Sequence, residues 1–167
     1  MTHTAERYHD ISTGHRVVGH ENKCRHLHGH NYRIHFLCQA APNMDSLDSL
    51  GRVIDFGVIK EKLCMWVEDN WDHKFLAWKN DTLVRGLLNL LEQDAAGGSS
   101  FTLDAEDDLM FRESVVFTSF NPTAENMAEY LVTVIGPQQL AGTGVILSAV
   151  KIEETRKCSA AFFLDEK

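Results

Sequence analysis

The stretch CRHLHGHNY, residues 24–32, decides the fold because it places a thiol and three imidazoles at the start of a β-strand. Side chains alternate between the two faces of a strand, so His28 and His30 point to the same side, about 7 Å apart along the chain. Two neutral imidazoles on one face are half of a metal site. Gly29 between them leaves room for another backbone or a substrate on the opposite face. A third ligand is expected from a neighbouring strand.

Length and composition indicate one soluble globular domain. The 167 residues suffice for a single substantial core, and 44% of them are apolar and 24% charged. The formal net charge of −8 argues against a nucleic-acid partner, which would need a basic surface. No apolar run approaches the roughly 18 residues that span a membrane, and the N-terminus lacks the features of a signal peptide. We therefore expect a cytosolic protein with no nucleic-acid or membrane partner, in which a local basic pocket for a small phosphorylated substrate remains possible.

The sequence contains four widely spaced cysteines and no CxxC pair, which predicts neither a thiolate zinc knuckle nor a disulfide framework. They are Cys24, Cys38, Cys64 and Cys158. Cys24 alone lies among polar and basic residues. Its neighbours Lys23 and Arg25, with a metal close by, would favour the reactive thiolate form. A nucleophile, a general base and a buried structural thiol are all compatible with this position.

Alternating apolar and polar residues predict a pair of strands in the N-terminal part. The first covers residues 8–18, with His15 near its end, and a polar turn at 19–24 returns the chain. The second strand has one face that begins with imidazole and continues with apolar side chains. That face carries His30, Tyr32, Ile34 and Phe36. The imidazole face therefore continues into the core face.

Helical spacing follows in the middle of the chain. After a short strand expected at 51–54, Asp55 can cap a helix that ends near Asn70, since apolar residues recur at helical intervals. Asp81 can cap a second helix, which the glycines and serines at 97–100 would end. The acidic segment that follows is poor in large apolar residues, so we expect it to be an excursion from the core.

The C-terminal part predicts one helix and three strands. A β-rich run at 114–120 precedes Pro122, a residue that favours the first turn of a helix. The buried stripe of this helix would be Ala124, Met127, Ala128, Leu131, Val132 and Ile135. Residues 145–152 and 159–164 are expected to form the last strands. This order indicates an α+β fold with helices on one face of an antiparallel sheet, in one domain of residues 1–167.

Three histidines with an open fourth position form the pattern of a catalytic zinc site, because that position can hold water or a substrate oxygen. The candidates are His15, His28 and His30. His26 shares the face of His28 by strand parity, so spacing alone does not exclude it. Surface or core histidines are the alternative interpretation. An HxH on a strand, a third histidine on the preceding strand and a nearby thiol favour the metal.

Two further groups could move protons or bind substrate. Asp72 next to His73 could orient an imidazole for proton transfer, although adjacent side chains often point apart. Glu154 has the strand parity of the apolar residues Val150 and Ile152, and a half-buried carboxylate needs a partner. That partner is either an arginine or the guanidine-like edge of a heterocycle.

Taken in order, these residues resemble the 6-pyruvoyl-tetrahydropterin synthase family. The matching motifs are His15, Cys24-x-x-x-His28-Gly29-His30-Asn31-Tyr32, VIDF at 53–56, Asp72-His73, PTAEN at 122–126 and Glu154-Thr155. The three-residue gap between Cys24 and His28 is most similar to the bacterial branch, the 6-carboxytetrahydropterin synthases of queuosine biosynthesis. The segment from about 80 to 113 is longer than the compact family pattern and is interpreted as an insertion.

The resemblance implies a tunnelling fold (T-fold), a four-stranded antiparallel sheet with two main helices on one face. Trimers close the sheets into a β-barrel, and two trimers typically stack, with active sites at subunit interfaces. The implied roles are zinc binding by His15, His28 and His30, proton transfer by Cys24, Asp72 and His73, and pterin binding by Glu154 with help from Thr123.

The implied substrate is 7,8-dihydroneopterin triphosphate. In the queuosine branch the side chain is cleaved, which releases acetaldehyde and triphosphate and leaves a 6-carboxyl group. In the pyruvoyl branch triphosphate is eliminated and the carbon chain is kept. A folate-pathway variant that lacks the thiol is disfavoured by Cys24. A non-catalytic zinc- or pterin-binding module would tolerate loss of Cys24, Asp72 or His73, so the presence of all three favours an enzyme.

Overall fold

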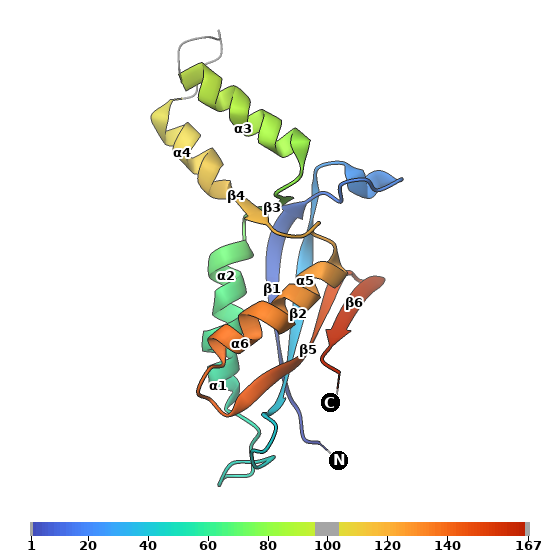
Figure 1. Cartoon of the computed structure of the whole chain (residues 1–167), viewed down its shortest axis with the longest axis vertical. Helices are drawn as coiled ribbons and strands as arrows, with labels where there is room; N and C mark the ends of the chain where they lie inside the picture. Colours follow the sequence, from blue (N-terminus) through green and yellow to red (C-terminus); the bar gives the residue numbers. More distant parts are fainter. Residues whose placement is uncertain (1, 96–103, 166–167) are drawn as a thin grey trace.

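The computed structural model describes residues 2–95 and 104–165. In this part of the chain, six strands form one sheet in the order β4-β3-β1-β2-β5-β6 (Figure 1). The strands are β1 (Ala5–His15), β2 (His28–Ala40), β3 (Phe75–Trp78), β4 (Val115–Thr118), β5 (Val145–Thr155) and β6 (Cys158–Phe163). The expected α+β class is confirmed.

The sheet is larger and more varied than the sequence predicted. β1, β2, β5 and β6 pair antiparallel with one another in that order, as expected. β3 and β4 extend the sheet beyond β1 in parallel orientation, so the prediction of four strands is wrong in number. The strand expected at 51–54 is also wrong. Arg52 instead binds the carboxylates of Asp48 and Asp55 within a loop, at 2.9 and 2.8 Å.

Two helical segments cover one face of the sheet (Figure 1). The first runs from α1 (Phe56–Ile59) through a π-helical turn, Lys60–Cys64, to α2 (Met65–Trp71). The second runs from α5 (Ala124–Tyr130) through a π-helical turn, Leu131–Ile135, to α6 (Gly136–Gln139). Both helices were expected at these places in the sequence.

Side-chain caps explain where both segments begin. The Asp55 carboxylate accepts a hydrogen bond from the backbone N–H of Gly57 (2.7 Å), as the sequence predicted. The Thr123 hydroxyl accepts one from the N–H of Asn126 (3.2 Å). Pro122 therefore precedes the cap of α5 and does not occupy the first turn of the helix, which corrects that detail.

The core lies between these helices and the face of the sheet that was predicted to be apolar. Its strand residues include Tyr32, Ile34 and Phe36 of β2 and Val150 and Ile152 of β5, all fully buried. The helix side contributes the predicted stripe, which is buried throughout: Ala124, Met127, Ala128, Leu131, Val132 and Ile135. Burial of this apolar surface is the main favourable contribution to folding.

A helical pair extends away from the sheet between β3 and β4 (Figure 1). It consists of α3 (Thr82–Ala95) and α4 (Ala105–Ser114). Asp81 caps α3 as predicted, accepting from the N–H of Leu83 at 3.0 Å, whereas α4 was not predicted. The expected end of α3 at 97–100 lies outside the described residues. Within the described ranges, the helices are all too short or too polar to cross a membrane.

Candidate metal centre and active site

Strand register brings three histidines together on the core face of the sheet. His15 lies directly opposite His28 in the β1–β2 ladder, and His30 lies two residues further along β2. One nitrogen from each of the three rings lies within 4.8 Å of the others. His26, which spacing alone did not exclude, is exposed before β2 begins and is not part of this group. The structure therefore assembles the group that the sequence favoured.

Hydrogen bonds from Nδ1 to backbone carbonyls leave the Nε2 lone pairs of His15 and His28 to bind a metal. His15 Nδ1 donates to the carbonyl of Pro122 and His28 Nδ1 donates to the carbonyl of His26, each at 2.7 Å. Because a carbonyl only accepts, the lone pairs of these two rings are on Nε2. The Nε2 atom of His30 is buried without a hydrogen-bond partner in the described structure. A metal ion would supply that partner, so the donor set fits one.

Burial favours the neutral, metal-binding form of His15 and His30. It lowers the pKa of His15, and the hydrogen bond to Pro122 offsets this only in part. It also lowers the pKa of His30, against the opposing effect of the nearby Glu154 carboxylate. Histidine binds metal ions as the neutral imidazole, so His15 and His30 can bind a cation without first losing a proton.

The loop before α5 holds His15 in place. The side-chain amide of Asn121 donates to the carbonyl of Val18 (2.9 Å), and its oxygen accepts from the N–H of Val18 (3.0 Å). This clamp fixes the chain just after β1 and places the neighbouring Pro122 carbonyl at His15. Such support orients a metal ligand and sets its tautomer. No sequence pattern indicates this contact, because more than 100 residues separate Val18 from Asn121.

A pocket of about 300 Å³ contains three of the other predicted site residues. Cys24 reaches it from the short helix Lys23–Arg25 and is half-buried. Thr123, the cap of α5, and Glu154 on β5 also line it. The strand parity expected for Glu154 is confirmed, since it follows buried Ile152 on the core face.

Glu154 links this pocket to the histidines. Its Oε1 atom lies 3.4 Å from His15 Nε2 and 3.5 Å from His30 Nε2. Its neighbour Glu153 points to the other face and pairs with Lys151 and His35. A heterocycle held by the Glu154 carboxylate would therefore lie beside the metal ligands.

Asp72 and His73 contact each other although they are adjacent in sequence. His73 has a positive φ of 55°, and its Nδ1 donates to Asp72 Oδ2 at 2.6 Å. The other carboxylate oxygen accepts from the N–H of Ser12 (2.7 Å). Burial would raise the pKa of Asp72, but the hydrogen bonds from Ser12 and His73 outweigh it and hold the pKa below its usual value. The carboxylate therefore orients the imidazole, as the sequence suggested.

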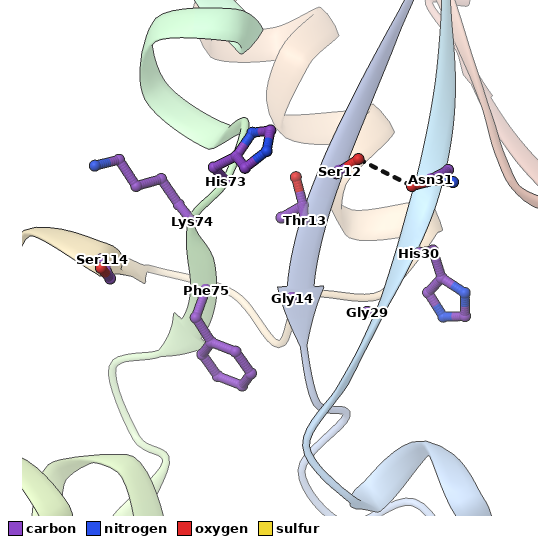
Figure 2. Close-up of a pocket in the computed structure, with 10 residues that line it drawn as sticks. All are labelled: Ser12, Thr13, Gly14, Gly29, His30, Asn31, His73, Lys74, Phe75 and Ser114. Atoms are coloured by element: carbon purple, nitrogen blue, oxygen red, sulfur yellow. Dashed lines mark hydrogen bonds between the residues drawn. The ribbon is translucent and has the colours of Figure 1, made fainter. Parts of the chain in front are cut away.

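Within one chain, this pair lies apart from the Cys24 pocket. His73 lines a different cavity of about 560 Å³, together with Gly14, Gly29 and Phe75 (Figure 2). In Figure 2 the His30 ring lies beyond β2 and points away from His73. The side chain of His73 is 83% exposed. The structure thus groups Cys24, Thr123 and Glu154 with the histidines, whereas Asp72 and His73 lie outside the Cys24 pocket and line another cavity, of about 760 Å³, with Glu154.

Tyr32 is a polar residue of the site that the sequence analysis placed only in the core. Its hydroxyl lies 3.0 Å from His15 Nε2 and 3.4 Å from Glu154 Oε1. Burial and the Glu154 carboxylate raise its pKa far above the usual value, so the hydroxyl stays protonated. A signal was present in the sequence, because a tyrosine on the same strand face as two metal ligands needs a partner for its hydroxyl once buried.

The comparisons with known proteins agree with this fold and site. The sequence model of the 6-pyruvoyl tetrahydropterin synthase family matches residues 4–164. The chain therefore belongs to this family, as its motifs indicated. It is 31% identical to the 6-carboxy-5,6,7,8-tetrahydropterin synthase of Rickettsia felis over 149 residues, which cover 89% of this chain and 91% of that protein.

Solved structures confirm the T-fold architecture of the chain. An uncharacterized protein from Wolinella succinogenes superposes with a TM-score of 0.78 at 24% identity, covering 99% of both chains. The 6-pyruvoyl tetrahydropterin synthase of Caenorhabditis elegans superposes with a TM-score of 0.58 at 22% identity, covering 97% of this chain and 95% of that one. At these identities the likeness concerns the fold alone.

Proposed function

We propose that this chain is a zinc-dependent 6-carboxytetrahydropterin synthase of queuosine biosynthesis. It would convert 7,8-dihydroneopterin triphosphate and one water molecule to 6-carboxytetrahydropterin, acetaldehyde and triphosphate. The observation that carries the proposal is the three-histidine group beside a pocket lined by Cys24 and Glu154. The similarity to 6-carboxy-5,6,7,8-tetrahydropterin synthases over 89% of the chain supports this branch of the family.

Zinc is the metal we assign to His15, His28 and His30. Three neutral imidazoles with an open fourth position are typical of a catalytic zinc site. A zinc ion bound there would act as a Lewis acid that makes the side-chain hydroxyls of the substrate more acidic. The tautomers of His15 and His28 are already those that present Nε2 to the ion.

The other residues would bind the substrate and move its protons. The Glu154 carboxylate would accept paired hydrogen bonds from the guanidine-like edge of the pterin ring, with Thr123 beside it. Cys24, as thiolate, would take a proton from the substrate side chain as a general base. His73, oriented by Asp72, would return a proton.

We infer that the working enzyme is a homo-oligomer, a trimer or a dimer of trimers with the sheets closed into a barrel. β3 pairs with β1 only at Gly14 and His15, and the backbone of Ser12 binds Asp72 and His73, so the outer edge of β1 before Ser12 is available to another chain. The second edge of the sheet is β6. The exposed His73 of one copy would then complete the Cys24 pocket of another.

Product analysis by mass spectrometry tests the proposal. The purified, zinc-loaded protein is incubated with dihydroneopterin triphosphate beside a Cys24→Ala variant whose zinc content is verified. We expect 6-carboxytetrahydropterin and acetaldehyde from the wild type and neither product from the variant.

Other outcomes have distinct meanings. A pyruvoyl product would keep the site and change the reaction to that of the 6-pyruvoyl-tetrahydropterin synthases. Absence of turnover by a folded, zinc-loaded oligomer would contradict the enzyme proposal and favour a zinc- or pterin-binding module.

A further inference from the structure

We propose that Tyr32 is a positioning residue that couples metal binding to pterin binding. Its hydroxyl lies between a metal ligand and the carboxylate proposed to hold the pterin ring, 3.0 Å from His15 Nε2 and 3.4 Å from Glu154 Oε1. The side chain is fully buried, with its ring edge-on to His15 and His30 at centroid distances of 5.7 and 5.4 Å. The inference rests on the proposed function and adds a link between its metal site and its pterin site.

The Tyr32 hydroxyl can donate a hydrogen bond to His15 Nε2 or to Glu154 Oε1, but not to both. A tyrosine hydroxyl donates only one hydrogen bond. His15 Nδ1 already donates to the Pro122 carbonyl, so His15 Nε2 carries a lone pair and accepts. Glu154 Oε1 is also an acceptor. Two acceptors therefore compete for one hydrogen of Tyr32.

A cation at the three histidines would decide this competition. A metal ion uses the lone pair of His15 Nε2, so that nitrogen no longer accepts a hydrogen bond from Tyr32. The hydroxyl can then donate only to Glu154 Oε1, which lies in the same buried surroundings. The hydrogen bond of Tyr32 thus moves from the metal ligand to the carboxylate when the metal binds.

The consequence is that the carboxylate is better held in the loaded protein. A fixed carboxylate loses less conformational freedom when a ligand binds, which increases affinity. Metal binding should therefore strengthen pterin binding without direct contact between the two ligands. Because coupling between binding sites is reciprocal, pterin should strengthen metal binding by the same factor.

The test uses 6-methylpterin, which has the pterin ring and lacks the side-chain hydroxyls that could reach the metal. Its dissociation constant is measured by fluorescence titration for the metal-free and the zinc-loaded full chain. We expect the wild type to bind about tenfold more tightly when loaded, a typical coupling between sites. Tyr32→Phe should bind 6-methylpterin with the same affinity in both forms.

Tyr130→Phe is the matched control. This half-buried tyrosine on α5 stacks on Trp71 and contacts Phe120, away from the histidines, so it should keep the wild-type ratio of affinities. Circular dichroism and zinc stoichiometry verify that each variant folds. If Tyr32→Phe does not fold, the wild type alone still provides a test, because saturating 6-methylpterin must tighten zinc binding about tenfold.

Each contrary result is distinguishable. A tenfold ratio that persists in Tyr32→Phe would overturn the role of Tyr32. Equal affinities of the two wild-type forms, or zinc binding unaffected by pterin, would overturn the coupling and leave the pterin site intact. Absence of 6-methylpterin binding to either form would remove the proposed pterin site, and the inference with it.

Discussion

The three-histidine group and the Asp72–His73 pair both contain imidazoles held by hydrogen bonds, but they differ in their surroundings. The histidine group forms entirely within one chain, whereas the Asp72–His73 pair lies outside the Cys24 pocket of the same chain. His15 is 1% exposed, and its hydrogen-bond partner is the carbonyl of Pro122. His73 is oriented just as firmly by Asp72, yet its side chain is 83% exposed.

This difference separates binding from proton transfer. Adjacent strands of one sheet suffice to assemble metal ligands, because strand register alone brings His15 and His28 together. The oriented imidazole of His73 has a fixed geometry, but the cavity of about 560 Å³ that it lines does not include Cys24. In the proposed oligomer, a second copy of the chain would cover His73 and supply the Cys24 pocket on which it acts. The predictions below test whether this contrast holds.

Removal of a metal ligand should have the largest effect. His30→Ala removes the buried Nε2 atom, and metal affinity should fall by more than about a hundredfold. This exceeds the loss expected when only a residue that hydrogen-bonds to a metal ligand is removed. Elemental analysis of the purified protein measures this as metal per chain. His9→Ala, which removes an imidazole of β1 that binds Glu68 at 2.7 Å, is the control and should retain the metal. Equal metal content in both variants would contradict the ligand assignment.

Mixing two inactive variants tests whether the pair acts across an interface. Cys24→Ala and His73→Ala should each lower kcat about 10²- to 10⁴-fold, the usual worth of a general acid or base. Reassembled at equal amounts, the two should regain about a quarter of the wild-type sites, since symmetric oligomers combine subunits at random. Mixed oligomers without any recovered activity would place both groups in the same chain.

Loss of the clamp on Val18 should have a moderate effect. Asn121→Ala removes two hydrogen bonds and should lower stability by about 1–2 kcal/mol and metal affinity about tenfold. Calorimetric zinc titration and thermal unfolding measure these changes. Asn70→Ala removes an amide that donates to the Trp66 carbonyl on α2, and should leave zinc affinity unchanged. The same loss of affinity in both variants would show that the clamp has no special link to His15.

The smallest effect is expected from the titration of Asp72. Its folded-state pKa lies below the unfolded value of about 3.9, so its contribution to stability is present above that pH and is lost as the pH falls through the folded-state pKa. Asp72→Asn should be about 1 kcal/mol less stable than the wild type at pH 7. Denaturant unfolding should show this difference shrinking as the pH falls below about 3.9. A constant difference at every pH would mean that the charge of Asp72 contributes nothing.

Local signals in the sequence predicted much of the fold. Asp55 and Asp81 cap the helices expected of them, because a cap is a short-range contact between a carboxylate and the following N–H groups. α4 was not predicted, since Leu109, Met110 and Phe111 are consecutive and exposed and give no amphipathic period.

Features that depend on contacts between residues far apart in the sequence could not be predicted. The run expected at 114–120 does form β4, but β3 is short and joins β1 at only two residue pairs, so no sequence pattern indicates β3 or the parallel pairing of these strands. The grouping of His15, His28 and His30 could be predicted because strand parity is a local rule. The hydrogen bond between Asp72 and His73 depends on a positive φ at His73, which a histidine rarely adopts. Likewise, the place of Tyr32 between His15 and Glu154 depends on three strands meeting.

The glycine pair beside the metal ligands has a consequence for sequence variation among related proteins. Gly14 and Gly29 face each other across β1 and β2. A Cβ atom at Gly29 would lie 3.0 Å from the backbone oxygen of Thr13, which cannot move without shifting the ladder. A Cβ at Gly14 would lie 2.8 Å from the ring of Phe75, which a smaller side chain would relieve. Relatives should therefore keep glycine at 29, while position 14 should vary together with position 75.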